Sequence, residues 1–320
     1  MIGFVLRRLL TFPLIVMAAN FIGFAFAFYF EPVVATSNPY SSGDIQLPPL
    51  FPEYFAYLSK FAQFDFGETY NGEPVLVAIG RLGIISLGLV GIALTLSIVL
   101  GILLGRLAVR QDSIKVSSWL TVLATVGLAS PGFYIAILLI ALFLLLTLYG
   151  PGNELLIPFQ GFGWDAHLIL PVLVLMIQPT VKIAQVTGST LTDELHKPYV
   201  KAGISLGLSF RSMKSRFAFR NVVAPILQAI ASSARLMVAE LIIIERLFNW
   251  PGIGRFIGNV LEPNADFFDA IVLTPPTMAA LLSVLVITFL IIDFLTIYIA
   301  RLVDPRLKMD MFTEARGTAK

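Results

Sequence analysis

The sequence predicts an all-α protein that crosses a membrane with six helices. Three observations support this: the mean hydropathy is +0.87, only 13% of the residues are charged, and the apolar residues are gathered into long runs. A helix needs about 20 apolar residues to cross a bilayer. Six segments reach this length, and together they would form one transmembrane domain over residues 1–320: 9–30, 82–107, 117–149, 168–190, 222–247 and 275–302.

The first span follows a short basic segment. Arg7 and Arg8 precede about 22 apolar residues, whereas the apolar core of a signal peptide is shorter and ends in a small-residue cleavage site. We therefore expect an uncleaved helix at 9–30. The next loop, 31–81, is too long for a simple connection, and its stretch LPPLFPEYFAYLSKF indicates a short amphipathic helix.

Spans two to four carry residues that affect packing. Glycines, which let helices approach closely, lie along the second span at Gly83, Gly88, Gly91, Gly101 and Gly105. The third span is long enough to tilt or break at the SPG triplet, Ser130 to Gly132. The fourth contains Pro171 and Pro179, which are tolerated where neighbouring helices satisfy the freed carbonyl groups. We therefore expect a helix bundle.

The orientation follows from the distribution of Lys and Arg. With both termini in the cytoplasm, sixteen basic residues lie inside, and Lys60, Arg81 and Arg255 lie outside. The opposite orientation would reverse this balance. The outer loops are then 31–81, 151–167 and 248–274, and residues 191–221, which we call the connecting segment, are cytoplasmic.

The connecting segment is basic but also carries an apolar pattern. Tyr199 to Asn221 holds five basic residues and no acidic one, which a simple positive-inside loop would explain. Such a loop would not place apolar residues in water, yet four precede or border the basic run: Val200, Ile204, Leu206 and Leu208. Gly207 is typical of a helix end, and Ser209 of a helix N-cap. We expect a short helix along the membrane surface that contacts another protein.

Charged residues inside the predicted spans are candidates for the transport pathway. They are Lys182, Arg235, Glu240, Glu245 and Asp293. Charges in a bilayer usually face the bundle interior or water. Arg235 and Glu240 are about 140° apart around their helix and cannot pair along one face. Arg235, Glu240 and Asp293 therefore either line a substrate path or make structural ion pairs or hydrogen bonds between helices; Glu245 is expected near the outer interface.

Several classes of site are excluded by composition and spacing. Without cysteine there are no disulfides or Cys-ligated metals, and without G-x-x-x-x-G-K-[ST] the chain does not hydrolyse ATP. His167 and His196 lie on opposite sides of the membrane in this topology and cannot share a metal. We expect no metal site and no catalytic site in this chain. We also expect no nucleic-acid partner. The stretch WPGIGRFIG does not have the glycine spacing of a dinucleotide-binding loop. We expect it to form an external gate or a loop that contacts the binding protein, made of Trp250, Pro251, Gly252 and Gly254, with the Trp250 ring partly exposed to water.

The stretch YVKAGISLGLS…RNVVAPIL resembles the EAA loop of binding-protein-dependent ABC importer permeases, in the form of the dipeptide, oligopeptide and nickel group. Further similarity lies in FVLRRLL, FDFGETYNGEPV, ASPGFYIAILLI, ERLFNWPGIGR and DFLTIYIARLVDPRL, nearly from end to end. The resemblance implies the type I importer permease fold. The sequence departs from the family's pattern at Ile204–Leu206, at Gly188 and in lacking PGDP after the first span.

In that family the EAA loop is a coupling helix that docks on a cytoplasmic ATPase. The docking residues implied are Tyr199, Val200, Ala202, Gly203, Gly207 and Leu208. Arg220, Asn221 and Pro225 would mark the return into the fifth span, and Asp193 stands at a position that is usually acidic.

The resemblance implies a non-catalytic transport subunit in the cytoplasmic membrane. It would pair with a second permease chain, with two ATPase subunits that bind ATP and Mg²⁺, and with an extracytoplasmic solute-binding protein. The cargo implied is a di- or oligopeptide, or alternatively a nickel chelate or another small solute. Two other classes remain open: a secondary transporter or channel that works alone, and a membrane scaffold whose basic loop contacts anionic lipid.

Overall fold

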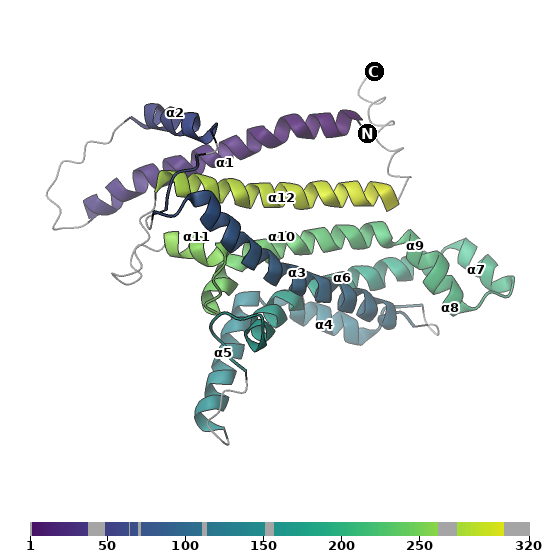
Figure 1. Ribbon diagram of the computed structural model, residues 1–320. Helices are drawn as coiled ribbons and strands as arrows, with labels where there is room; N and C mark the ends of the chain where they lie inside the picture. The colour runs from purple at the N-terminus through teal and green to yellow at the C-terminus, as the bar shows by residue number, and fades with distance from the viewer. Residues whose placement is uncertain are drawn as a thin grey trace. The chain divides into compact units, whose positions relative to one another are not determined.

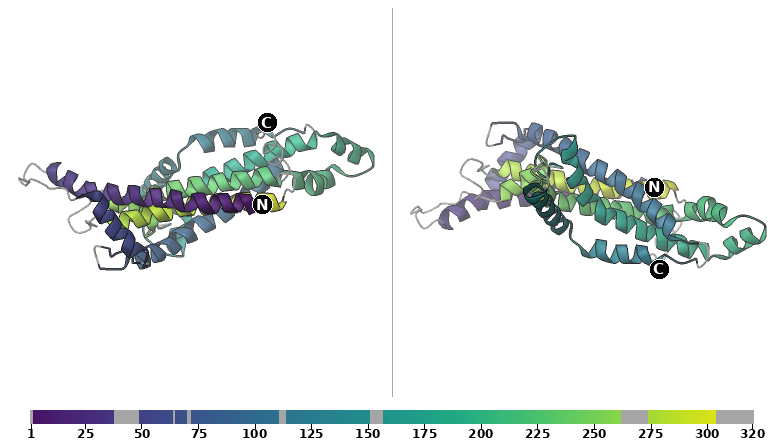
Figure 2. Two further views of the ribbon diagram at one scale, coloured as in Figure 1. Left: turned by 90° about the horizontal axis from the view of Figure 1, so that it is seen from above. Right: turned by 90° about the horizontal axis from the view of Figure 1, so that it is seen from below.

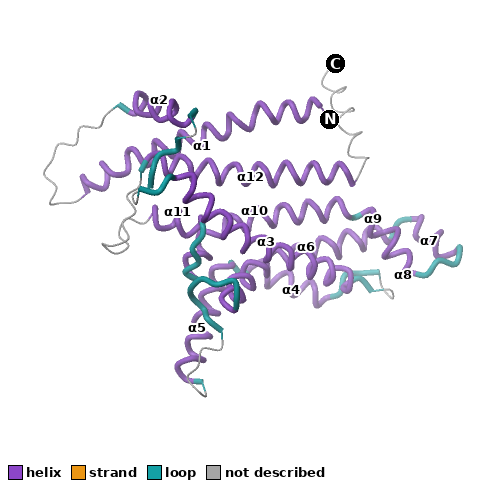
Figure 3. The backbone as a smooth tube through the Cα atoms, viewed as in Figure 1, coloured by secondary structure: helices purple, strands orange, loops and turns teal. Residues whose placement is uncertain are grey.

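The computed structural model describes residues 2–37, 49–63, 65–69, 72–110, 114–150, 157–261 and 274–303. Over these residues the chain is helical and has no strand (Figure 3). Six helices are long and apolar enough to cross a membrane, which confirms the predicted all-α class with six spans. They lie at Leu10–Phe30, Val75–Ala108, Gly132–Tyr149, Ala166–Leu195, Val223–Leu247 and Pro275–Thr296.

The chain divides into two compact units, one of residues 1–86 and 251–291, the other of residues 87–250 and 292–320. The first unit contains α1 (Ile2–Ser37), α2 (Leu50–Phe61), the start of α3 (Val75–Ala108), α11 (Ile253–Leu261) and most of α12 (Pro275–Val303). Helices α1 and α12 run side by side (Figures 1 and 2). They approach closely at Gly23, where an added Cβ would lie 2.7 Å from the carbonyl oxygen of Met278.

Helix α2 is the amphipathic helix that the sequence predicted in the first outer loop. Tyr54 and Tyr57 form its buried face and pack against Phe24 of α1. Asn20 is buried between the elements; its side-chain amide donates to the Tyr57 hydroxyl and to Ser283 Oγ, both at 3.1 Å, and accepts from the Tyr54 hydroxyl at 3.2 Å. Because each polar atom has a partner, this network specifies how α1, α2 and α12 pack.

The second unit is built around α6 (Ile169–Leu195), which follows a short 3-10 turn, Ala166–Leu168. Helices α4 (Ser118–Ala129), α5 (Gly132–Tyr149) and α10 (Val223–Leu247) pack on α6. Leu175, Ile183 and Leu191 of α6 are completely buried. The most buried candidate span is therefore the central one of this unit.

Glycines of α3 make the close approaches that the sequence suggested. An added Cβ would lie 2.8 Å from Ile183 Cβ at Gly101 and 2.6 Å from the Ala184 oxygen at Gly105, so α3 packs tightly on α6. Gly88 lies against Trp164, and Gly83 against Ile253. Gly91 faces open space, so close packing does not explain every glycine of the stripe.

The third predicted span breaks where the SPG triplet indicated. Helix α4 ends at Ala129 and α5 begins at Gly132, with Ser130 and Pro131 extended between them. As a result, only α5 is long enough to count as a candidate span, and α4 is a shorter apolar helix of 12 residues.

Candidate functional site

The connecting segment folds into short helices beyond the ends of α6 and α10 (Figure 1). They are α7 (Pro198–Ser205), α8 (Phe210–Ser212), a π-helix (Met213–Ala218) and α9 (Phe219–Asn221). Pro198 occupies the first position of α7, where proline is favoured. A π-helix is rare and often marks a functional region.

The predicted end of α7 and the predicted cap of α8 are both confirmed. Gly207 has φ +91°, which favours glycine, and Leu208 N–H donates to the Gly203 oxygen at 3.1 Å across the helix end. Ser209 Oγ accepts from Ser212 N–H at 3.3 Å at the start of α8. These two residues turn the chain back toward α10.

One face of α7 packs against the rest of the unit. Val200 is buried in a cluster with Leu195, Met213 and Val222. Gly203 is buried too, and an added Cβ there would lie 2.7 Å from Met213 Sδ. Helix α7 is therefore held against the returning chain and does not hang free as a solvated loop would.

The borders of this packed face of α7 and the turn after the helix expose apolar atoms. Tyr199, Ile204 and Leu208 are each more than one third exposed, and Leu206 is 85% exposed. Ala202 is exposed as well. Adjacent exposed apolar side chains on a fixed scaffold are typical of a protein contact surface. The basic segment thus carries an apolar surface, as its sequence pattern suggested.

A buried carboxylate braces the base of α7. Glu194, at the end of α6, accepts from the Tyr199 hydroxyl at 2.9 Å and from Asn221 Nδ2 at 2.8 Å, and it pairs with Lys197 Nζ at 2.6 Å. It therefore links α6, α7 and α9. Burial of the phenol and its hydrogen bond to Glu194 raise the pKa of Tyr199 to about 12.

The sequence interpretation named Asp193 and missed Glu194. Asp193 is exposed, whereas Glu194 is 6% exposed. The spacing of Glu194 and Lys197, three residues apart at a helix end, is the signal that could have found this brace. Of the other expected residues, Asn221 joins the brace, Arg220 is exposed and Pro225 lies in the first turn of α10.

Basic residues attach the connecting segment to the end of α3. Lys214 Nζ donates to the Val109 oxygen at 2.6 Å, and the guanidinium of Arg106 lies 4.8 Å from the centre of the Phe219 ring. Burial, reinforced by the nearby charge of Arg106, lowers the pKa of Lys214. Part of the positive charge of this region is therefore used in internal contacts.

The helix break is supported by polar side chains from two neighbouring helices. Gln178 Nε2 of α6 donates to the Ser130 oxygen at 2.7 Å. The Glu240 carboxylate of α10 lies against Gly132 at the start of α5, where an added Cβ would lie 2.7 Å from Glu240 Oε2. The Gln178 bond satisfies a carbonyl group that the break frees, as membrane helices require. For Glu240 the sequence left open a contact with another helix or a place in a pathway; the structure shows the contact with α5, and the pathway role stays a prediction.

Arg235 pairs with Asp293 of α12, not with Glu240. Both side chains of this pair remain more than one third exposed, so the pair is a structural contact that also faces outward. Glu245, which we expected near the outer interface, is instead completely buried. It lies on the buried face of α10, and its backbone oxygen accepts a hydrogen bond from the backbone N–H of Trp250 at 2.7 Å.

The expectation of a partly wet Trp250 is wrong. Its side chain is completely buried, and its ring lies 4.9 Å from Phe162 and 5.8 Å from Trp164, centre to centre. Phe162 and Trp164 are the exposed members of this cluster. Gly252 and Gly254 are buried and Pro251 is half-buried. Sequence position alone did not show which aromatic residue would cover the others.

Comparison with known proteins places these features in a family context. A family model described as "Binding-protein-dependent transport system inner membrane component" matches residues 97–309. The chain is 29% identical over 264 residues to the dipeptide transport system permease protein DppB of Lactococcus lactis, covering 82% of each chain. It is 30% identical over 268 residues to a putative peptide permease protein of Brucella ovis, covering 82% of this chain and 81% of that one. It is 26% identical over 233 residues to the oligopeptide transport system permease protein OppB of Escherichia coli, covering 71% and 72%.

Proposed function

Because this chain belongs to the family of inner membrane components of binding-protein-dependent transport systems, we propose that it is the permease subunit of an ATP-driven importer of di- or oligopeptides. Its six candidate spans make it a multi-pass membrane protein. The names of its relatives, dipeptide and oligopeptide permeases, support peptide cargo. A nickel chelate or another small solute is the alternative cargo.

The observation that carries the coupling role is that α7 is fixed in place while apolar side chains on it stay exposed. Val200, Gly203 and the Glu194 brace hold the helix, and Tyr199, Ile204 and, just after the helix, Leu206 remain exposed. A rigid apolar surface of this kind transmits force between a docked subunit and the membrane helices. We propose that two cytoplasmic ATPase subunits, which bind ATP and Mg²⁺, grip this surface and its counterpart on a second permease chain.

In this assembly the chain itself performs no chemical reaction. The free energy for transport comes from the different contacts that α7 makes with the open and closed forms of the ATPases. Both termini and the connecting segment lie in the cytoplasm, and a solute-binding protein delivers peptide to the outer loops. The transport pathway forms at the interface of the two permeases, with Arg235, Glu240 and Asp293 as its candidate polar lining.

Docking at α7 can be tested with Leu206→Asp. This side chain is 85% exposed, so we expect the substitution to leave folding intact and to place a charge on the apolar surface. We expect loss of ATPase co-purification and of ATP-dependent peptide uptake. Gln63→Asp is the control, because it adds the same charge at an exposed polar position outside the connecting segment. Full ATPase retention by Leu206→Asp would contradict docking at this site.

Reconstitution into liposomes separates the remaining classes. We expect uptake of a labelled di- or tripeptide only when the second permease, the ATPases and the binding protein are present. Uptake by this chain alone would identify a secondary transporter or channel. Competition by a nickel chelate but not by unlabelled peptide would move the proposal to the alternative cargo.

A further inference from the structure

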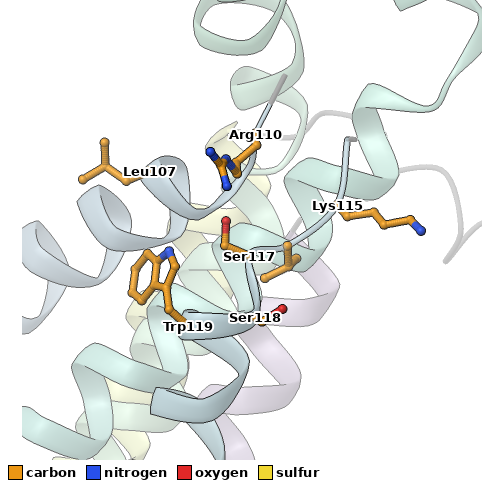
Figure 4. A pocket seen from close by; sticks show the side chains of 7 residues that line it. Leu107, Arg110, Lys115, Ser117, Ser118 and Trp119 are labelled. Atoms are coloured by element: carbon orange, nitrogen blue, oxygen red, sulfur yellow. The ribbon is translucent and has the colours of Figure 1, made fainter. Parts of the chain in front are cut away.

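A pocket of about 510 Å³ lies where α3 ends and α4 begins, apart from the connecting segment and from the intramembrane charges discussed above. It is lined by Leu107, Arg110, Lys115, Ser117, Ser118 and Trp119, together with Val116. Figure 4 shows Arg110, Ser117 and Trp119 gathered around it, with the Lys115 stem extending outward from the far side. The pocket thus combines two cations, two hydroxyl groups and an aromatic ring.

The walls of this pocket are well defined. Val109 and Val116, one of its lining residues, form an antiparallel bridge. Ser117 donates to the Ala108 oxygen twice, from its backbone N–H at 2.9 Å and from Oγ at 2.8 Å. These bonds hold the end of α3 beside the start of α4. Residues 111–113 between them lie outside the described part of the chain.

The two cations of the pocket, Arg110 and Lys115, are both exposed. Within the described residues, which do not include Asp112, neither forms an ion pair with an acidic group. By contrast, the neighbouring Arg106 and Lys214 are engaged with Phe219 and with the Val109 oxygen. Two exposed cations beside the Ser118 hydroxyl group are suited to a phosphate group.

Exposed apolar surface continues from the pocket along both helices. On α3, Leu107 is 63% exposed and Leu103, one turn away on the same face, is 50% exposed. On α4, Trp119 is 45% exposed, and Val122 and Val126 continue its face at 63% and 62%. The pocket also lies at the end of the candidate span Val75–Ala108, and the ends of membrane spans are where headgroups and interfacial Trp rings are found.

We propose that this pocket binds the phosphate headgroup of an anionic phospholipid. Arg110, supported by Lys115 and the Ser118 hydroxyl group, contacts the phosphate, and the acyl chains lie on the apolar faces of α3 and α4. A free phosphate ion would use the same cations but would leave these apolar faces uncovered. This inference depends on the position of the pocket at a membrane boundary, and it is independent of the cargo.

Fluorescence quenching of Trp119 tests the proposal. The purified full chain is titrated with phosphatidylglycerol or phosphatidylcholine brominated near the headgroup, and Trp119→Phe identifies the signal of this ring. We expect phosphatidylglycerol to reach half-maximal quenching at a concentration roughly 25-fold lower than phosphatidylcholine does, because each of the two cations contributes about fivefold. The Arg110→Gln/Lys115→Gln variant should remove this preference. Lys201→Gln/Arg211→Gln, which removes the same charge from exposed positions elsewhere in the unit, should retain it.

Each other outcome overturns the proposal. Equal quenching by the two lipids, or equal loss in the control variant, would indicate a non-specific basic surface. Displacement of the lipid by an equal concentration of inorganic phosphate would identify a site for the free ion. Loss of quenching in the complex with the second permease and ATPases would show that protein covers the pocket.

Discussion

At the residue scale, Glu194 and Asp193 are adjacent carboxylates with opposite environments. Glu194 is buried and receives hydrogen bonds from Tyr199 and Asn221 as well as the Lys197 ammonium. Asp193 is exposed. Replacing a buried carboxylate that accepts hydrogen bonds costs free energy of folding, because its former donors are left buried with a weaker acceptor or none.

We therefore expect Glu194→Gln to lower the thermal stability of the purified protein, with a loss of about 1.5–3 kcal/mol typical of hydrogen bonds to a charged group. Asp193→Asn removes the same charge next door and should change stability by no more than about 0.5 kcal/mol. A thermal-shift assay in detergent measures both variants. Equal effects of the two would show that Glu194 is not the brace.

Tyr199 provides a prediction about pH. Because its pKa is raised from 10.0 to about 12, the folded protein holds the phenol proton more tightly than the unfolded chain. The stabilisation that this gives is complete below pH 10 and is lost as the pH rises to about 12. The absorbance difference between the native protein and Tyr199→Phe should show a tyrosinate midpoint near 12. A midpoint near 10 would mean that the bond to Glu194 does not form in solution.

At the scale of elements, the backbone turn after α7 decides how the contact surface is presented. Gly207 has φ +91° with open space where a Cβ would lie, so a side chain there would strain the backbone without any clash. Gly72, in the first outer loop, has φ +74° and equally open surroundings. The two positions therefore carry a similar conformational cost of about 1–2 kcal/mol for a non-glycine residue.

We expect Gly207→Val to leave membrane insertion intact but to uncouple ATP hydrolysis from uptake, because the turn and Leu208 would shift relative to α7. Gly72→Val, with matched strain, should keep the normal number of peptides imported per ATP hydrolysed. The measurement is the ratio of uptake to hydrolysis in reconstituted complexes. Normal coupling in Gly207→Val would argue against force transfer through this turn.

At the scale of the whole molecule, the charge distribution predicts one orientation, and the absence of cysteine makes it easy to test. Single cysteines at Gln63 and Ser205 occupy exposed positions in the first outer loop and in the connecting segment. In intact cells, an impermeant maleimide should label Gln63→Cys at once. It should label Ser205→Cys only after permeabilisation. The reverse pattern would place the connecting segment outside the cell and remove the basis for ATPase docking.

Much of the site was predictable because its signals are local. Gly207 and Ser209 act through their own backbone conformation and hydroxyl group, and the SPG triplet breaks a helix wherever neighbours satisfy the freed groups. Glu194 and Trp250 were misjudged because their burial depends on which side of a helix or loop is covered by distant residues. A single sequence does not specify that covering surface.

The sequence by itself determined the class of this protein, its six spans and the apolar character of its basic connecting segment. The class and the spans follow from the length of the apolar runs, and the apolar pattern of the connecting segment is read directly from its residues. All of these signals are contained in continuous stretches of the chain. Only the tertiary structure decided that Glu194 braces α7, that Glu240 lies against Gly132 at the start of α5, and that Asn20 bonds Ser283, 263 residues away. The physical reason is that a polar group in an apolar surrounding must find its hydrogen-bond partner in space, wherever that partner lies along the chain.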